Sequence, residues 1–456
     1  MSQQKPNWLP LIILLVIAAA AAFAFSDSSP VKAIAEGVNS GDTAWMIVAS
    51  GLVLLMTPGL AYFYGGMVNH KNVISTMLQS FIAMGVISVI WIIFGFSLAF
   101  GDSIGGFVGN PMTFFMFKGV FEHPLELVSN LDPAVKLSFT IPFALFAFFQ
   151  MKFAVITPAL ISGALAERIN FKAYVLFMVL FCIAIYAPLA HMCWHPAGLL
   201  FNYGVLDFAG GTVVHMSAGW AALAGALYLK RRRSHADANM LPPANIPYVL
   251  LGTALLWFGW FGFNAGSATT AGTLAVSAFA VTHVAAASAG LSWVLYDVAR
   301  GKKVSALGFC IGAVVGLVAI TPASGFVTIP VAIFIGAVAA VISNILAHWR
   351  ANSKLDDSLD VFPCHGVGGM VGMVMTGLFA SSAVNGLVAD QGLFIDGSMT
   401  LFIKHMVALV GVSFFAFVGS YILLVITDKI VPLRVSEEEE RLGLDISQHD
   451  ESLMEA

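Results

Sequence analysis

The chain has 456 residues, of which 59% are hydrophobic and only 10% are charged. A soluble domain carries roughly 25% charged residues, so this composition excludes a soluble fold and predicts an α-helical protein that crosses a membrane many times. The net charge of −4 is too small to indicate a nucleic-acid partner. The four cysteines lie in or beside apolar runs without a C-x-x-C pair, so we expect buried free thiols.

The first 24 residues have the pattern of a secretory signal peptide. Lys5 precedes an apolar run over residues 9–25, and this run contains the A-x-A cleavage pattern as AFA at 22–24. We therefore expect residues 1–24 to be a cleaved signal peptide, with a retained first helix as the alternative. The membrane domain is then expected at 25–427 and a cytoplasmic tail at 428–456.

Eleven further apolar runs are each read as a crossing of the roughly 30 Å hydrocarbon core. They cover residues 43–65, 73–100, 138–164, 171–193, 208–229, 246–264, 271–299, 304–321, 328–348, 364–380 and 401–427. Eleven spans can be divided into two repeats of five and one final span. Because each repeat has an odd number of spans, the second repeat has the opposite orientation in the membrane. We therefore predict an all-α polytopic fold with a 5+5 inverted repeat plus a final helix.

The basic residues sort by loop and predict the orientation in the membrane. One side receives most of them, including the run Lys230–Arg233, whereas the other side receives only Lys32, Lys118, Lys136 and Lys404. Basic residues concentrate on the cytoplasmic side of cell membranes. The N-terminus of the mature chain is therefore expected outside and the C-terminus in the cytoplasm.

Two glycine-rich stretches place one histidine each inside an apolar span. They are DFAGGTVVHMSAG (207–219) with His215 and VFPCHGVGGMVG (361–372) with His365, and they open the fifth and tenth spans. An aspartate precedes each histidine, Asp207 by eight residues and Asp360 by five. Because the two stretches occupy matching places in the two halves, they support the inverted repeat.

Both histidines are interpreted as lining a narrow interior path, because ionisable residues within spans usually face a cavity or pathway. The alternative is helix packing, with each histidine bonded to a neighbouring helix. Glycines beside both rings would let helices approach closely and would leave open volume. Zinc would need further Cys, His or carboxylate ligands, and no spaced cluster supplies them. We expect no metal and no other cofactor.

Aromatic residues gather in the spans that would surround such a path. They are Phe149 and Phe153 in FAFFQMKFAV, Trp194 at the outer end of the fourth span, and Trp260 and Phe263 in LLWFGWFGFNAGS, which also contains Ser267. Aromatic faces attract cations, and a serine hydroxyl can accept a hydrogen bond from an N–H donor. The pattern indicates a site for a small cation, and an interfacial aromatic belt is the alternative.

Lys152 directly precedes Phe153, where a positive charge on the path would repel a cation. Adjacent helix residues point about 100° apart. We therefore expect Lys152 to face a subunit contact or to snorkel outward.

Several motifs together resemble one known family. DFAGGTVVH, GWFGFNAGS, GALAERI and HGVGG, in this order and spacing, are similar to the ammonium transporter family (Amt/Mep, related to the Rh proteins). TPGLAYFYGG in the first span and the closing LRVSEEEERLGLD resemble it too. The resemblance implies a homotrimeric ammonium transporter of the cell inner membrane, not an enzyme, with one central pore per subunit. It also implies a tail that couples subunits and can bind a PII-type signal protein.

The resemblance assigns roles to the residues of the pore. His215 and His365 match the twin histidines that line the family's pore, and Phe153 and Phe263 match its stacked phenylalanine gate. Trp260 matches a pore-lining tryptophan.

The resemblance also implies an outer ammonium-recruitment site. Trp194 and Ser267 match this site, with Phe149 beside it. Asp207 matches an acidic residue that orders the site without binding the substrate directly.

Energetics favour transport of the deprotonated species. Moving an unpaired ion into dry protein costs several kcal/mol even after relaxation, whereas removing the proton of ammonium at pH 7 costs about 3–5 kcal/mol. We expect recruitment as ammonium, deprotonation near Asp207, and passage of ammonia past the histidines. The proton either returns outside or crosses through the histidine pair. A passive ammonia or carbon dioxide channel and an ammonium sensor are the alternative functions.

The tail contains an acidic run, SEEEE at 436–440. It lies on the same predicted side as Lys230–Arg233, so we expect the two runs to pair across subunits. Surface ion pairs are individually weak, and any switching would therefore require a partner protein.

Overall fold

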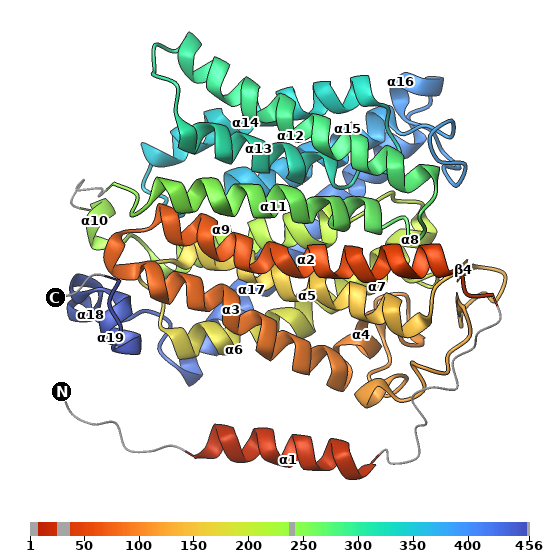
Figure 1. Ribbon diagram of the computed structural model, residues 1–456, viewed down its shortest axis with the longest axis horizontal. Coiled ribbons are helices and arrows are strands. Elements are labelled where there is room, and N and C mark those ends of the chain that lie inside the picture. Colours follow the sequence, from red (N-terminus) through yellow and green to blue (C-terminus); the bar gives the residue numbers. More distant parts are fainter. Residues whose placement is uncertain (1–7, 25–36, 237–241, 454–456) are drawn as a thin grey trace.

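The computed structural model describes residues 8–24, 37–236 and 242–453. Within these ranges ten helices are long and apolar enough to cross a membrane, and the shorter α13 (Ala306–Ile320) is an eleventh apolar helix. The long helices lie side by side in one bundle (Figure 1). The predicted all-α polytopic fold is therefore confirmed.

The first half of the bundle contains five membrane-spanning units. They are α2 (Ser40–Met67), α3–η2–α4 (Val73–Ile90, Trp91–Gly95, Phe96–Phe100), α5 (Phe143–Leu165), α6–η4–α7 (Phe171–Phe181, Cys182–Tyr186, Ala187–Trp194) and η5–α9 (Gly211–Met216, Ser217–Leu229). The inserts η2, η4 and η5 are π-helical turns. Such turns widen the helix by one residue and occur mostly at functional sites.

The second half has the same number of units plus a final helix. They are α11 (Ile246–Gly266), α12 (Thr273–Ala299), α13, α14 (Ile329–Ala351) and η6–α15 (Phe362–Val367, Gly368–Phe379), followed by α17 (Thr400–Ile430). The insert η6 is again π-helical and carries His365, as η5 carries His215. Both histidine stretches therefore begin with the same irregular helical geometry.

Short elements connect the spans. They are η1 (His70–Asn72), β1 (Ser103–Ile104), β2 (Val108–Gly109), η3 (Phe115–Phe117), β3 (Glu126–Val128), β4 (Lys136–Ser138), α8 (Leu199–Tyr203), α10 (Arg233–Ala236) and α16 (Leu393–Asp396). The predicted start of the third span at residue 138 is wrong, because 136–138 pair antiparallel with 126–128 and α5 begins only after Pro142. The end of the bundle that carries β3 and β4 is called the hairpin end below.

Figure 1 draws α1 (Leu9–Ala24) apart from the bundle, and large side chains along it, such as Ile12 and Leu15, are exposed. An apolar helix that lies apart from the bundle fits a signal sequence and a separate membrane anchor equally well. Cleavage after residue 24 stays a prediction. The four cysteines are buried and free, as the sequence predicts.

The tail folds back onto its own chain as α18 (Glu437–Leu442) and α19 (Leu444–His449), at the end of the bundle called the tail end. Arg233 forms an ion pair of 3.1 Å with Glu437, and its backbone N–H donates to Glu440 at 2.6 Å. Asp445 is buried and accepts backbone N–H bonds at the start of α3. The predicted pairing of the two charged runs thus forms within one chain through Arg233, and pairing across subunits stays a prediction.

A buried ion cluster joins the tail ends of α5, α9 and α14. Arg232 binds Asp356 at 2.8 Å and Glu167 at 2.5 Å, and all three side chains are at most 10% exposed. Arg168 donates to the backbone oxygen of Asp356 and to Ser358. Buried charges persist only when they are paired and hydrogen-bonded. The cluster therefore fixes the loop that leads into η6.

Candidate functional site

A cavity of about 720 Å³ lies at the hairpin end and is called the vestibule below. Five of the predicted site residues line it, from α5, α7, α11 and the segment before η5. They are Phe149, Phe153, Trp194, Asp207 and Ser267. The structure therefore brings together side chains that are up to 118 residues apart, between Phe149 and Ser267, as the sequence pattern predicts.

Phe153 and Phe263 close the floor of the vestibule. Their ring centroids are 4.2 Å apart with an interplanar angle of 35°, and the two side chains are 1% and 0% exposed. Phe153 lines the vestibule, whereas Phe263 lines a second, smaller cavity. The stacked pair thus separates the two spaces, which places both residues where a gate is expected.

Ser267 and Trp194 present complementary groups above this pair. The Ser267 hydroxyl donates to the Phe263 carbonyl at 2.8 Å, so its proton is used and its oxygen lone pairs remain free to accept. The Trp194 indole N–H donates to the Asp207 carbonyl at 3.0 Å, which holds the ring 6.0 Å from Phe153. Aromatic faces and a hydroxyl acceptor together suit a small cation with N–H donors.

The carboxylate of Asp207 is hydrogen-bonded to the backbone at the start of η5. It accepts backbone N–H bonds from Gly210 at 2.9 Å, Gly211 at 2.6 Å and Thr212 at 2.8 Å, and a further bond from the Thr212 hydroxyl. These are the unpaired donors at the start of η5, where a negative charge is also favoured by the helix dipole. Asp207 therefore anchors the helix that carries His215.

His215 and His365 meet in the centre of the bundle. Their Nδ1 atoms are 3.4 Å apart, and the two rings are buried. A hydrogen bond between two imidazole nitrogens requires one protonated and one unprotonated nitrogen, so the neutral pair shares one proton across this contact. The His215 Nε2 atom is buried without a hydrogen-bond partner, and Trp260 stacks on the same ring at 5.3 Å.

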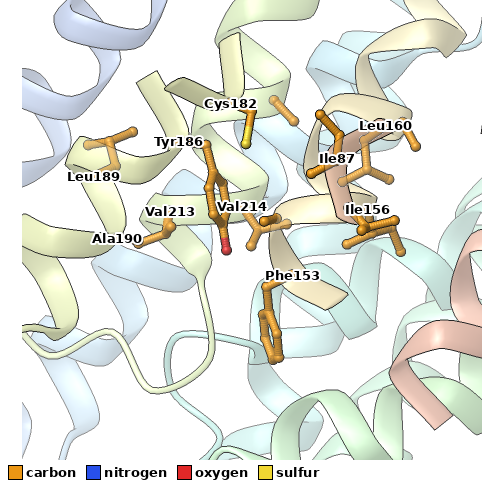
Figure 2. Packing of buried hydrophobic residues seen from close by; sticks show 14 of the residues in the cluster. Ile87, Phe153, Ile156, Leu160, Cys182, Tyr186, Leu189, Ala190, Val213 and Val214 are labelled. Atoms are coloured by element: carbon orange, nitrogen blue, oxygen red, sulfur yellow. The ribbon is translucent and has the colours of Figure 1, made fainter. Parts of the chain in front are cut away.

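The space beside the histidines is very small and mostly apolar. Its volume is about 10 Å³, which corresponds to about one water-sized molecule. Apart from the two imidazoles, its lining is apolar or aromatic and includes Ile156, Leu160, Val214, Trp260 and Phe263. Figure 2 shows Phe153, Ile156 and Leu160 following one another along α5. An ion that entered this space would lose nearly all of its hydration.

The aspartate that matches Asp207 in the second half is Asp357 and not Asp360. Asp357 precedes His365 by eight residues, as Asp207 precedes His215. Its carboxylate accepts the backbone N–H bonds of Val361 at 3.1 Å and Phe362 at 2.7 Å at the start of η6, while Asp360 pairs with Arg350. Burial, together with the nearby charge of Asp360, raises the pKa of Asp357 to about 6.

Two supporting residues were missed at the sequence level. Thr212 holds Asp207 through its hydroxyl, and Thr321 accepts the Trp260 indole N–H at 2.9 Å, which fixes that ring beside His215. Thr212 lies inside the quoted glycine-rich stretch, so its polarity was a usable signal. Thr321 lies after α13 with no local pattern to mark it. Within the described ranges, no three His, Cys, Asp or Glu side chains lie close enough together to hold a metal ion.

Comparison with known proteins agrees with this geometry. A sequence model described as Ammonium Transporter Family matches residues 44–454. The chain belongs to the ammonium transporter family. It is 45% identical to a putative ammonium transporter of Methanothermobacter thermautotrophicus over 417 residues, covering 91% of this chain and 98% of the relative. It is also 45% identical to an ammonium transporter of Bacillus subtilis over 418 residues, covering 90% and 98%.

Solved structures share the fold of this ammonium transporter. Saccharomyces cerevisiae Mep2 superimposes with a TM-score of 0.79 at 33% identity, covering 88% of this chain and 89% of Mep2. A structure described as a sensor Amt protein superimposes with a TM-score of 0.80 at 30% identity, covering 90% and 98%. The protein is thus a multi-pass membrane transporter for ammonium and not an enzyme.

Proposed function

We propose that this ammonium transporter recruits the ammonium ion in the vestibule, removes one proton there, and conducts neutral ammonia past His215 and His365. The proton crosses separately through the histidine pair. The observation that carries this proposal is the cavity of about 10 Å³ beside the twin imidazoles, because it has no room for a hydrated ion.

Recruitment of the charged form is supported by the chemistry of the vestibule. Phe149, Phe153 and Trp194 offer aromatic faces, and the Ser267 oxygen is free to accept from an N–H donor. A cation over an aromatic ring gains about 0.5–2 kcal/mol, depending on how much water is excluded. The vestibule therefore favours ammonium over ammonia before the gate.

Deprotonation is supported by the cost of the alternative. Moving an unpaired ion into a dry, apolar space costs on the order of 20 kcal/mol in the Born limit, and this falls to several kcal/mol only where water enters and the protein relaxes. Giving up one proton at pH 7 costs about 3–5 kcal/mol. Neutral ammonia can then donate to, or accept from, an imidazole such as the unpartnered Nε2 of His215. Potassium has no proton to give up, so its entry requires the full desolvation free energy of an ion.

A separate path for the proton is supported by the shared hydrogen bond of the imidazoles. Each ring can accept a proton at one nitrogen and release one at the other. The contact of 3.4 Å between the Nδ1 atoms is short enough for transfer when the rings fluctuate. A transporter of this kind moves net charge, whereas a passive ammonia or carbon dioxide channel does not.

Ammonium-evoked currents in proteoliposomes on a solid-supported membrane test the proposal. We expect wild-type protein to give a saturable current. We expect a His215→Ala, His365→Ala double variant to carry at most about one tenth of the wild-type current. Loss of the proton path should raise the activation free energy of charge transfer by at least about 1.4 kcal/mol, which corresponds to tenfold in rate. Ammonia flux, followed by a pH dye inside the vesicles, should persist in the variant. A wild-type protein that carries ammonia without current would instead be a passive gas channel.

We also propose a homotrimer with the N-terminus of the mature chain outside and the tail in the cytoplasm, where a PII-type protein is the expected partner. The support is family membership and the placement of most basic residues at the tail end.

A sensor function is the second candidate, because one structure of the same fold is described as a sensor Amt protein. Wild-type protein without measurable ammonium transport would favour the sensor.

A further inference from the structure

Lys152 is the only charged residue in α5, the helix that supplies Phe149 and Phe153 to the vestibule. Its side chain is half-buried, and its Nζ atom lies 5.9 Å from the centre of the Phe148 ring and 3.7 Å from Met151 Sδ. Among the described residues no carboxylate lies within ion-pairing distance of it. The charge of Lys152 is therefore not neutralised within the described part of its own chain, and its expected place at a subunit contact stays a prediction.

The other lysines close to the vestibule are neutralised. Lys136 lines the vestibule and pairs with Glu126 at 2.9 Å. Lys404 pairs at 2.6 Å with Asp390, which also lines the vestibule. The contrast shows that the fold compensates positive charge at the rim of this cavity and leaves Lys152 uncompensated.

Helix geometry places Lys152 beside the vestibule and not in it. At about 100° per residue, Phe149 and Phe153 point in nearly the same direction, and Lys152 points roughly 80° away from them. Accordingly, Lys152 does not contribute to the lining of the vestibule. One helix diameter is about 10 Å, so the charge lies on the order of 10 Å from a bound cation.

We propose that Lys152 lowers the affinity of the vestibule for ammonium through long-range repulsion, without touching the ion. At an effective dielectric constant of about 20, a unit charge 10 Å away changes cation binding by roughly tenfold. Partial exposure to solvent reduces this, so we expect about three- to tenfold. The inference rests on the proposed recruitment of ammonium in its charged form, because neutral ammonia would not be repelled.

The position also predicts which kinetic constant responds. The repulsion acts on the cation in the vestibule, before the gate formed by Phe153 and Phe263. It therefore raises the half-saturating ammonium concentration and leaves the steps below the gate unchanged. A purely structural role in packing against Phe148 would instead change the maximal current or the stability of the protein.

Ammonium-evoked currents of a charge series at position 152 test this. We expect Lys152→Gln and Lys152→Met to lower the half-saturating concentration about three- to tenfold and Lys152→Glu to lower it further. Lys152→Arg should match wild type, and the maximal currents should stay within about twofold. Lys172→Gln is the matched control, because Lys172 is an exposed lysine at the tail end of α6.

The outcomes separate this inference from the proposed function. If wild-type currents saturate with ammonium but Gln, Met and Glu variants share the wild-type half-saturating concentration, the role of Lys152 is refuted and the recruitment mechanism stands. If Lys152→Arg shifts as much as Lys152→Met, the effect is packing and not charge. If wild type gives no saturable current, recruitment of the ion fails and the role of Lys152 fails with it.

Discussion

Replacing Asp207 with alanine is expected to reduce ammonium transport to less than about a tenth of wild type. The substitution removes the acceptor for four backbone N–H groups, the weakest from Val213 at 3.4 Å, and for the Thr212 hydroxyl, all of them buried. Each buried donor left unsatisfied costs about 1–3 kcal/mol, and 1.4 kcal/mol corresponds to tenfold. The start of η5 would shift, and His215 would move relative to His365. Uptake of methylammonium into proteoliposomes measures the loss.

Thr212→Val is the matched control for this prediction. It removes the hydroxyl bond to Asp207 and the weaker contact of that hydroxyl with Cys193 Sγ at 3.3 Å, but it keeps the backbone N–H bonds to Asp207, so transport should fall much less. Wild-type uptake by a correctly folded Asp207→Ala protein would show that the carboxylate is not needed to position the pore.

Replacing Arg232 with alanine is expected to destabilise the protein by about 3–5 kcal/mol, because it leaves two buried carboxylates, Asp356 and Glu167, without their partner. The thermal unfolding midpoint in detergent should fall clearly. Arg233→Ala is the control, because Arg233 and its partner Glu437 are 51% and 83% exposed and such pairs contribute at most about 1 kcal/mol. Equal midpoints for the two variants would contradict a structural role for the buried cluster.

The same pair of variants should differ in their response to acid. Burial alone would raise the pKa of Asp356, but hydrogen bonds and charge from Arg232, together with the charge of Arg168, outweigh it and hold the pKa below its usual range. A depressed carboxyl pKa stabilises the fold fully above the unfolded pKa, about 4. This contribution declines as the pH falls below that value and is lost once the pH falls through the lower pKa of the folded state. Arg232→Ala should therefore lose less stability between pH 6 and about 3 than Arg233→Ala does.

The helices were predictable because each one contains a long, mostly apolar run. Such runs have no other way to satisfy their backbone groups in hydrocarbon, so α2, α11 and α17 fall where hydropathy places them. The start of α5 was not predictable, because β3 and β4 are only three residues long each and depend on pairing between residues eight to twelve apart. The π-helical turns carry no hydropathy signal at all.

The site residues were predictable where the chemistry of a residue type and the family motifs pointed to the same position. Histidines inside apolar spans identified His215 and His365. The aromatic runs of the third and sixth spans, together with the family resemblance, identified Phe153 and Phe263, and the structure brings these residues together. Asp360, the aspartate nearest to His365, was named from the sequence, although Asp357 has the eight-residue offset that Asp207 has from His215. Which aspartate caps η6 is decided by Arg350, which takes Asp360 as its partner and leaves Asp357 for the backbone.

Potassium permeation tests the central claim most directly, namely that the pore beside the twin histidines is too dry for an intact ion. Currents evoked by potassium and by ammonium are compared in wild-type proteoliposomes at equal concentration and driving force. A desolvation cost for potassium that exceeds the deprotonation cost of ammonium by about 3 kcal/mol or more predicts a potassium current of at most about one hundredth of the ammonium current. A potassium current equal to the ammonium current would contradict the mechanism.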